Sequence, residues 1–325
     1  MGRQLYAFLA TFLAIAASLA EDSKQSTAED LLARASRAGS LEAAAKGPCR
    51  IRYKFKVMTS PEIEGTYSRL WASADRSREE ISTPDFSETV IINGGKMWTS
   101  RNLPYEPEVF TRLRSALDPS FKILHGENVQ KSKKKQGKEH STCIDLSVKN
   151  GTQRQLCFDE QTNALVATSS GTFRSEYSEF KRIEPSLIPH AVRMFNGGQL
   201  EGSVEAIELA PQPSLGDSSF ARPPDAEEWT FCERPTPPKL VHTQSPEYPA
   251  LATAARWQGS VDLYGVLETD GTLKHTGIIR SAKPVFEKAA LDAVKEWRWE
   301  PGTCNGVPIR LETQITINFS LSGNQ

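Results

Sequence analysis

Residues 313–321 read Thr-Gln-Ile-Thr-Ile-Asn-Phe-Ser-Leu, and this stretch decides the fold of the last quarter of the chain. Apolar side chains stand at the odd positions from 315 to 321, and polar side chains stand at the even positions between them. An alternation with a period of two is typical of a strand that has one face on a core and one face in water. The stretch therefore predicts a terminal β-strand.

The residues before this strand predict a small domain at 241–325. A short helix at 250–257 precedes an alternating run at 261–267, and Asp270-Gly271 makes the turn into a second strand at 273–280. A helix begins at Pro284. Its apolar residues recur at helical spacing, so one face should pack on the sheet: Phe286, Ala290, Ala293, Val294 and Trp297. We expect a three-stranded antiparallel sheet with helices.

Residues 21–209 predict a second domain that is rich in strands. Helices are expected from Thr27 to Gly39, at 41–46, and at 107–117 with Val109, Leu113, Ala116 and Leu117 on one side. Alternating or β-rich runs predict strands at 50–57, 65–72, 76–81, 88–93, 96–99, from about 121, and at 142–148, 154–158, 164–169 and 174–182. The whole chain is therefore expected to be α+β, with a long antiparallel sheet in this domain.

The lysine-rich run 131–138 lies between two of these strand patterns. We interpret it as a solvated hairpin loop rather than a site for a polyanion. The formal net charge of −1 agrees with this, because nucleic acids and anionic membranes require a concentrated basic surface. The sequence thus predicts no nucleic-acid partner.

Residues 1–20 have the features of a secretory signal peptide. Arg3 precedes an apolar run at 5–17, and Ser18-Leu19-Ala20 offers small residues at the positions that a signal peptidase reads. The alternative is an uncleaved membrane anchor, although the run is shorter than the roughly 20 residues that span a bilayer. We expect a cleaved signal and a protein that works in the periplasm.

Five cysteines are available for pairing in such an oxidising compartment. Cys143 and Cys157 flank an Asn150-Gly151 hairpin turn, which would bring them nearly opposite on two strands. Cys232 and Cys304 would attach the segment before the C-terminal domain to the last loop of that domain. These two disulfides leave Cys49 outside both pairs. No cysteine spacing indicates a metal or redox site.

Residues 210–240 are interpreted as a linker, because prolines at 211, 213, 223, 224, 235, 237 and 238 interrupt regular structure. Trp229 and Phe231 suggest that this linker packs on a domain.

The chain shows no catalytic signature. Its histidines are scattered and none has a nucleophile or carboxylate at a recognisable spacing: His125, His140, His190, His242 and His275. Phosphate-binding loops and His-Glu-x-x-His motifs are also missing from the sequence. We therefore expect a protein that is not an enzyme and has no cofactor.

Several short motifs follow one another in the C-terminal domain: Tyr248-Pro249, Gly259-Ser260-Val261, Asp270-Gly271, the helical run 289–297, Pro301, Gly306-Val307-Pro308-Ile309 and the terminal Ile-x-Ile-x-Phe. Together they resemble the C-terminal domain of the TonB energy-transducer family. That resemblance implies a sheet whose edge receives an extended segment, the TonB box, from an outer-membrane receptor. By resemblance, the partner-binding edge is Thr313, Gln314, Ile315, Thr316, Ile317, Asn318 and Phe319.

Three uses of this edge stay open: binding of a receptor or other protein, pairing with a second copy of the chain, and covering by the linker. The chain also departs from the family. A transducer has an uncleaved anchor that couples to a proton-driven motor and a long proline-rich stalk, whereas this chain has a signal-like segment and a folded domain. A membrane-anchored energy transducer is therefore an alternative, and a periplasmic binding protein linked to TonB-dependent transport is the main hypothesis.

The order of one helix followed by many strands, with a hairpin at 94–98 and Ile188-Pro189-His190 late in the sheet, resembles the half-barrel domains of the periplasmic lipoprotein carriers LolA and LolB. The resemblance covers roughly residues 30–210. It implies a curved sheet that could enclose a lipid or acyl chain, and the alternative is an interior that the protein's own side chains fill. A lipid or lipoprotein carrier is thus a second alternative function.

Overall fold

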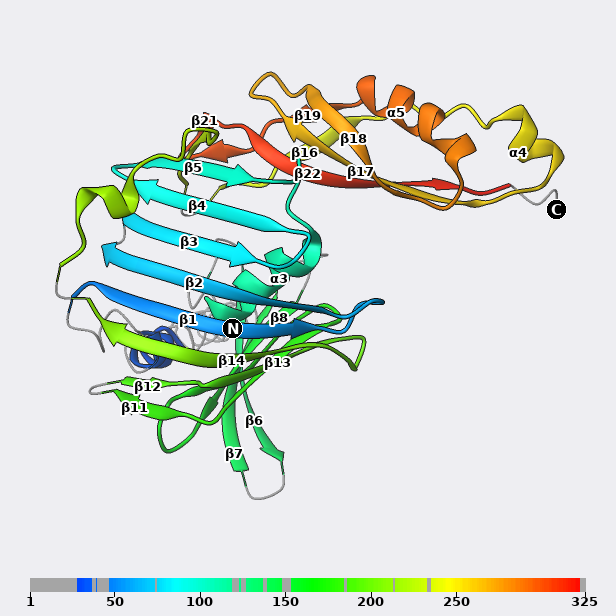
Figure 1. The fold of residues 1–325 in the computed structure, drawn as a ribbon. Coiled ribbons are helices and arrows are strands. Elements are labelled where there is room, and N and C mark those ends of the chain that lie inside the picture. The colour runs from blue at the N-terminus through cyan, green and yellow to red at the C-terminus, as the bar shows by residue number, and fades with distance from the viewer. Residues whose placement is uncertain are drawn as a thin grey trace, which may run out of the picture. The chain divides into compact units, whose positions relative to one another are not determined.

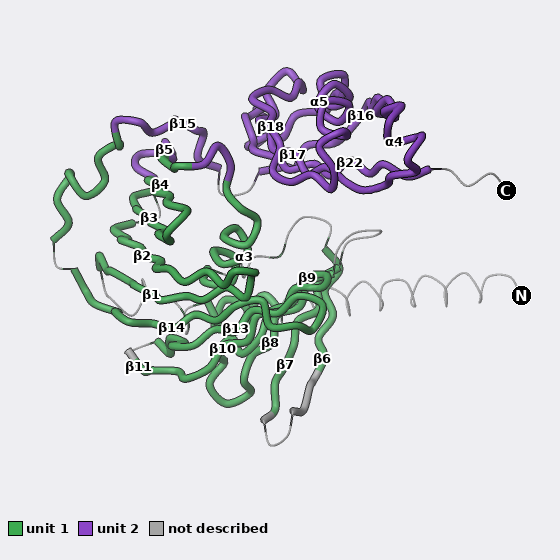
Figure 2. Tube along the Cα trace, turned by 45° about the vertical axis from the view of Figure 1, so that its right-hand side comes forward, with its two compact units in different colours: residues 1–91, 100–102, 106–223 green, residues 92–99, 103–105, 224–325 purple. Residues whose placement is uncertain are grey.

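The computed structural model describes residues 28–36, 39, 47–73, 75–118, 123, 127–136, 139–147, 153–183, 186–212, 214–232 and 235–321. These fall into two compact units, one within residues 1–91, 100–102 and 106–223 and one within 92–99, 103–105 and 224–325 (Figure 2). The expected signal segment at 1–20, helix at 41–46 and turn at Asn150-Gly151 lie outside the described residues. No helix within the described ranges is both long enough and apolar enough to cross a membrane.

A 13-stranded antiparallel sheet is formed by strands between residues 49 and 230 (Figure 1). Its order is β15-β5-β4-β3-β2-β1-β14-β13-β10-β9-β8-β7-β6. The strands are β1 Cys49–Val57, β2 Ile63–Ser73, β3 Arg76–Ser82, β4 Ser87–Asn93, β5 Lys96–Arg101, β6 Asn128–Gln136, β7 Glu139–Ser147, β8 Gln153–Asp159, β9 Leu165–Ser170, β10 Phe173–Ser178, β13 Ala191–Asn196, β14 Gln199–Pro211 and β15 Glu227–Thr230. A separate short pair is formed by β11 Lys181–Ile183 and β12 Ser186–Ile188.

The chain fills this sheet from the middle outwards. It starts at β1, runs strand by strand to β5, and passes through helix α3 Glu108–Leu117. It then resumes at the far end with β6 and returns to β14, which pairs with β1 from Cys49↔Pro211 to Val57↔Gly202. The α+β fold with a long antiparallel sheet, predicted from the sequence, is confirmed.

Helix α3 lies on the concave face of the sheet (Figure 1). The apolar side chains of β1 are buried on that face, as its alternation predicts. Phe110 of α3 stacks on Phe86 with ring centroids 4.7 Å apart and meets Phe55 of β1 at 5.9 Å. Tyr177 of β10 donates a hydrogen bond of 2.9 Å to the Ala116 carbonyl. The helix thus contacts both halves of the sheet, and its buried residues are Phe110, Leu113 and Ala116. Val109 and Leu117, which the sequence also placed on the buried side, are only half-buried.

The predicted loop at 131–138 is wrong. Most of this run belongs to strand β6, which pairs with β7 from Asn128↔Ser147 to Gln136↔Glu139. Ser132 donates a 2.5 Å hydrogen bond to Asp145 of β7, and Lys131 is exposed. β6 ends the described sheet, and a lysine-rich sequence on an edge strand discourages pairing with another chain. A lysine-rich run is therefore compatible with an edge strand.

Several other observed elements differ from the predicted ones in their boundaries. The run 174–182 is divided into β10 and β11, and Glu179 between them adopts a φ of 55°. Strands β13 and β14 were not predicted. The segment interpreted as a linker carries a short 3-10 helix, η1 Asp217–Phe220, as well as β15, which pairs with β5, and the start of β16.

The C-terminal domain has the predicted sheet, with the order β18-β17-β22. Its elements are β16 Lys239–His242, α4 Ala250–Ala254, β17 Gly259–Leu267, β18 Leu273–Ser281, η2 Pro284–Phe286, α5 Glu287–Lys295, β19 Arg298–Glu300, β20 Thr303–Cys304, β21 Val307–Pro308 and β22 Leu311–Phe319. The Asp270-Gly271 turn depends on glycine, because Gly271 has a φ of 78° and its backbone lies against Trp299, leaving no room for a side chain.

Both predicted disulfides are present. Cys143 and Cys157 are directly opposite on β7 and β8, and Cys232 is bonded to Cys304. Cys49 is buried at the start of β1 and belongs to neither pair.

Removing each disulfide should destabilise a different unit. The separations are 14 residues for Cys143–Cys157 and 72 for Cys232–Cys304. By the loop-entropy relation the losses are about 3 and about 4 kcal/mol. Scanning calorimetry of C143A/C157A and C232A/C304A should show one transition lowered in each variant. The assignment fails if both variants lower the same transition.

Candidate functional site

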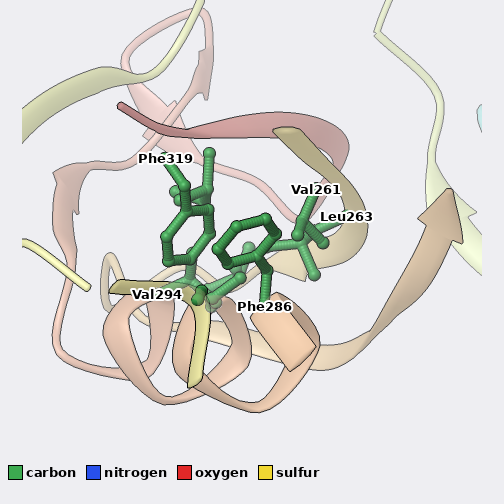
Figure 3. Close-up of a cluster of buried hydrophobic side chains, with 9 residues drawn as sticks. Val261, Leu263, Phe286, Val294 and Phe319 are labelled. Atoms are coloured by element: carbon green, nitrogen blue, oxygen red, sulfur yellow. The ribbon is translucent and has the colours of Figure 1, made fainter. Parts of the chain in front are cut away.

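The inward side chains of strand β22 pack on the hydrophobic core of the C-terminal domain. Ile317 and Phe319 are buried, and Ile315 packs against the same cluster. Figure 3 shows Phe286 and Phe319 face to face above α5, and their ring centroids are 4.3 Å apart. Val261 and Leu263 of β17 and Val294 of α5 complete this cluster. The alternation read from the sequence is confirmed, and it holds β22 in one orientation.

The backbone directions in β22 follow from its neighbour β17. The carbonyl of Ser260 accepts a 2.9 Å hydrogen bond from the Ala282 N–H on the β18 side. The backbone N–H and C=O groups of the even-numbered residues of β17 therefore point towards β18. The backbone N–H and C=O groups of the odd-numbered residues of β17 consequently point towards β22. Because β17 and β22 pair without a register shift, with Val261↔Ile317, the odd-numbered residues of β22 bond to β17. The backbone groups of Thr316 and Asn318 consequently point away from β17.

The solvent face of this edge is polar and partly fixed. Asp262 of β17 accepts hydrogen bonds of 3.0 and 2.7 Å from Arg280 and one of 2.8 Å from the Thr316 hydroxyl. Both Thr316 and Asn318 are exposed. The structure places all seven predicted edge residues on one strand. Ile315, Ile317 and Phe319 pack on the core, Thr316 and Asn318 present side chains and outward backbone groups, Gln314 is exposed, and Thr313 is half-buried.

A second candidate site is a cavity in the first unit. Its volume is about 430 Å³. Residues of α3, β9, β10 and β13 line it, among them Arg112, Thr168, Phe173, Ser175, Met194 and Phe195. Arg112 lies over the Phe173 ring at 4.7 Å and binds Glu201 through two hydrogen bonds of 2.9 and 2.5 Å. The wall of the cavity is therefore mixed: apolar side chains and hydroxyls lie beside three arginines and two acidic side chains, namely Arg112, Arg154, Arg174, Asp118 and Glu201.

A buried ion cluster occupies another part of the same interior. Arg114 of α3 binds Glu106 at 2.9 Å, Glu79 at 2.5 Å, and also Glu88, which in turn lies 3.4 Å from Arg101. Burial raises the pKa of the Glu88 carboxyl, and Arg114 opposes that shift. Burial lowers the pKa of Arg114, but Glu79, Glu88 and Glu106 raise it overall. The cluster keeps Arg114 charged and fixes α3 to β3 and β4.

The described residues contain no group of three or more metal-ligating side chains arranged to hold an ion. His140, His242 and His275 are exposed, and burial lowers the pKa of the half-buried His190. His125 lies outside the described residues.

The geometry of the C-terminal domain defines a class: a three-stranded antiparallel sheet, covered by one helix, that ends in an edge strand. Residues 244–321 match the family described as Gram-negative bacterial TonB protein C-terminal. Protein TonB of Vibrio cholerae serotype O1 is 32% identical over 88 residues, which are 26% of this chain and 36% of that protein. Protein TonB of Escherichia coli K12 is 37% identical over 67 residues, 20% of this chain and 28% of that protein. The chain thus spans less than half the length of either relative.

Solved structures similar to the chain include a LolA superfamily protein from Nitrosomonas europaea. It is 12% identical, with a TM-score of 0.43, over 60% of this chain and 97% of that protein. A TonB CTD from Pseudomonas aeruginosa is 22% identical, with a TM-score of 0.24, over 27% of this chain and 90% of that protein. The TonB resemblance predicted for the last quarter of the chain is confirmed by the family match.

Replacing Arg114 tests the ion cluster. Arg114→Met leaves buried carboxylates without their main partner, so the first unit should lose about 3 kcal/mol or more of unfolding free energy at pH 8. Without Arg114, the pKa of Glu88 rises further above its unfolded value, so the folded state binds more protons between those two values. The loss should therefore be smaller at pH 5 than at pH 8, as measured by denaturant unfolding.

The matched control is Arg78→Met. Arg78 lies on β3 like Glu79, but it pairs with the partly exposed Glu80, so the expected loss is no more than about 1 kcal/mol. Equal losses for the two variants, or a deficit of Arg114→Met that grows towards low pH, would contradict the account.

Proposed function

We propose that this chain is a periplasmic binding protein, without catalytic activity, whose C-terminal domain recognises a protein by adding a strand to the outer edge of β22. The observation that carries the proposal is the position of β22 at the end of the described sheet, with the backbones of Thr316 and Asn318 directed away from β17. An edge of this kind is satisfied by water or by an incoming strand. Its face is polar and its core is well packed, which suits reversible pairing.

The partner we favour is an extended segment of an outer-membrane receptor, which would connect the chain to TonB-dependent transport. Support comes from the match of residues 244–321 to the TonB C-terminal family. A second copy of the chain is the competing occupant. An energy transducer anchored in the inner membrane would use the same edge, and a mature N-terminus at Glu21 in periplasmic extract would exclude that alternative.

A proline at Thr316 tests edge pairing. Thr316→Pro removes an N–H that points outwards, and the ladder to β17 keeps its own hydrogen bonds. Binding of a synthetic receptor peptide that carries a TonB box should weaken about tenfold or more, measured by titration calorimetry with the full chain. Circular dichroism and the melting temperature should stay close to those of the unmodified protein.

Thr316→Val is the matched control, because it loses the hydroxyl that bonds Asp262 but keeps the backbone N–H. It should bind the peptide normally. Equal binding by Thr316→Pro would refute edge pairing. Concentration-dependent dimerisation that Thr316→Pro abolishes, without peptide binding by the unmodified chain, would assign the edge to self-association.

The cavity of the first unit favours a second function, the carrying of a lipid or acyl chain. Its 430 Å³ lies within the range of small-molecule sites, and Phe173, Met194 and Phe195 supply apolar wall. The buried side chains of α3 fill the interior beside this cavity. We keep this function as an alternative to the main proposal.

Filling the cavity tests the carrier function. Ser175→Trp places an indole in the cavity, whereas Gln199→Trp on β14 adds it at an exposed position outside the cavity. A fluorescent long-chain fatty acid should bind the unmodified protein and Gln199→Trp, and it should bind Ser175→Trp about tenfold more weakly. Absence of binding by the unmodified protein, or equal binding by all three proteins, would remove the carrier function.

A further inference from the structure

The Cys232–Cys304 disulfide lies close to strand β22. Cys304 ends β20, and residues 305–310 lead from it directly to Leu311, where β22 begins. On the other side, Cys232 follows β15 and precedes β16. The disulfide therefore links the segment by which the chain reaches the C-terminal domain to the start of its last strand. Strands β16 to β19 and helices α4 and α5 lie inside the covalent loop.

Backbone contacts support the same link. Thr236 and Thr303 exchange two hydrogen bonds, of 2.7 Å and 3.1 Å, beside the disulfide. Gly302 has no space for a side chain, because a Cβ would meet Leu311 and the Thr236 carbonyl. The Gly302 carbonyl also accepts a 2.9 Å hydrogen bond from Ile309. The loop before β22 is thus held to residues 232–236 by covalent and non-covalent bonds.

Arg310, the last residue before β22, adds a third connection. Its guanidinium lies 4.7 Å from the ring centroid of Trp229, and it approaches Glu268 at 3.4 Å and Glu227 at 3.9 Å. Trp229 and Glu227 belong to β15, directly upstream of Cys232. Three independent contacts therefore join residues 227–236 to residues 302–310.

From these contacts we infer that the Cys232–Cys304 link is a mechanical tether: tension between β22 and the upstream chain passes through the disulfide and bypasses the rest of the C-terminal domain. The inference rests on the proposed function, because a partner strand on β22 is what would pull on that strand in the cell, and it needs the upstream end of the chain to be held, as in the membrane-anchored alternative. It assigns to the disulfide a mechanical role in addition to its effect on stability.

The register of the sheet shows what the tether avoids. Gly259, where β17 begins, is opposite Phe319, where β22 ends. Without the disulfide, the Thr236–Thr303 hydrogen bonds, the Arg310 contacts and the β16–β19 pairing would have to break first. Tension applied at the C-terminal end of β22 would then leave the sheet through Gly259. The load would then act at one end of the β17–β22 ladder and open its hydrogen bonds one pair at a time. With the disulfide, the load runs along β22 from Phe319 to Leu311 and leaves through Cys304.

The test is force spectroscopy on the full chain with handles at both termini. Two dyes attached by chemistry that spares cysteine, at the exposed positions 270 and 288, report whether β17, β18 and α5 stay folded. The oxidised protein should keep its energy transfer at forces that abolish it in C232A/C304A. Its extension on rupture of the C-terminal domain should be shorter by roughly 240–260 Å, the length of a 72-residue chain segment.

The matched control is C143A/C157A, which lacks the other disulfide and should behave like the unmodified protein. If C232A/C304A does not fold, the same measurement is made on single C143A/C157A molecules before and after addition of a reductant. Loss of energy transfer at the same force with and without the Cys232–Cys304 bond would overturn the tether. Because no partner is present in this experiment, its failure is distinct from a failure of the peptide-binding test.

Discussion

An antiparallel sheet that does not close must leave two edge strands, and their outward backbone groups have to be satisfied by water or by another strand. This constraint shapes both units of the chain. The sheet of the first unit ends at β6, where a lysine-rich sequence opposes pairing with a foreign strand. The sheet of the C-terminal domain ends at β22, where Thr316 and Asn318 carry no charge and their backbones point outwards. One edge repels a strand, and the other can accept one.

The interior of the first unit follows from the route of its chain. Because strands are added outwards from β1 and then inwards from β6, the chain has to cross the sheet once, and α3 lies on this crossing. Phe110 buries one side of the helix, and Arg114 anchors it to the carboxylates of β3 and β4. The space beyond Arg112 stays open as the cavity. A helix that must cross the sheet thus limits the volume that a ligand could occupy.

The alternation of apolar and polar residues predicted the strands whose inward side chains are large, such as β1 and β22. The spacing of Cys143 and Cys157 around the Asn-Gly turn predicted the first disulfide. The alternation missed β14 because the inward positions there include Gly202, Val204 and Ala206, and a side chain at Gly202 would collide with Met194 and the Lys56 carbonyl. The sequence reading missed β6 because its many lysines suggested a solvated loop and its alternation of apolar and polar residues is weak. The sequence predicted the candidate edge as seven residues of one strand. It did not show that the backbones of Thr316 and Asn318 point outwards, because that direction depends on how β17 pairs with β18 and β22, and the sequence of one strand does not contain this register.

The pairing of β1 with β14 makes the first unit an insertable module. Cys49 and Pro211 are opposite each other, and Gln212 donates a 2.7 Å hydrogen bond to the Pro48 carbonyl, so the run of chain from β1 to β14 begins and ends at the same place. A domain whose ends meet can be inserted between two other segments without separating them, and it tolerates new termini elsewhere. Circular permutation could therefore join residues 48 and 212 with little change to strands β1 to β14.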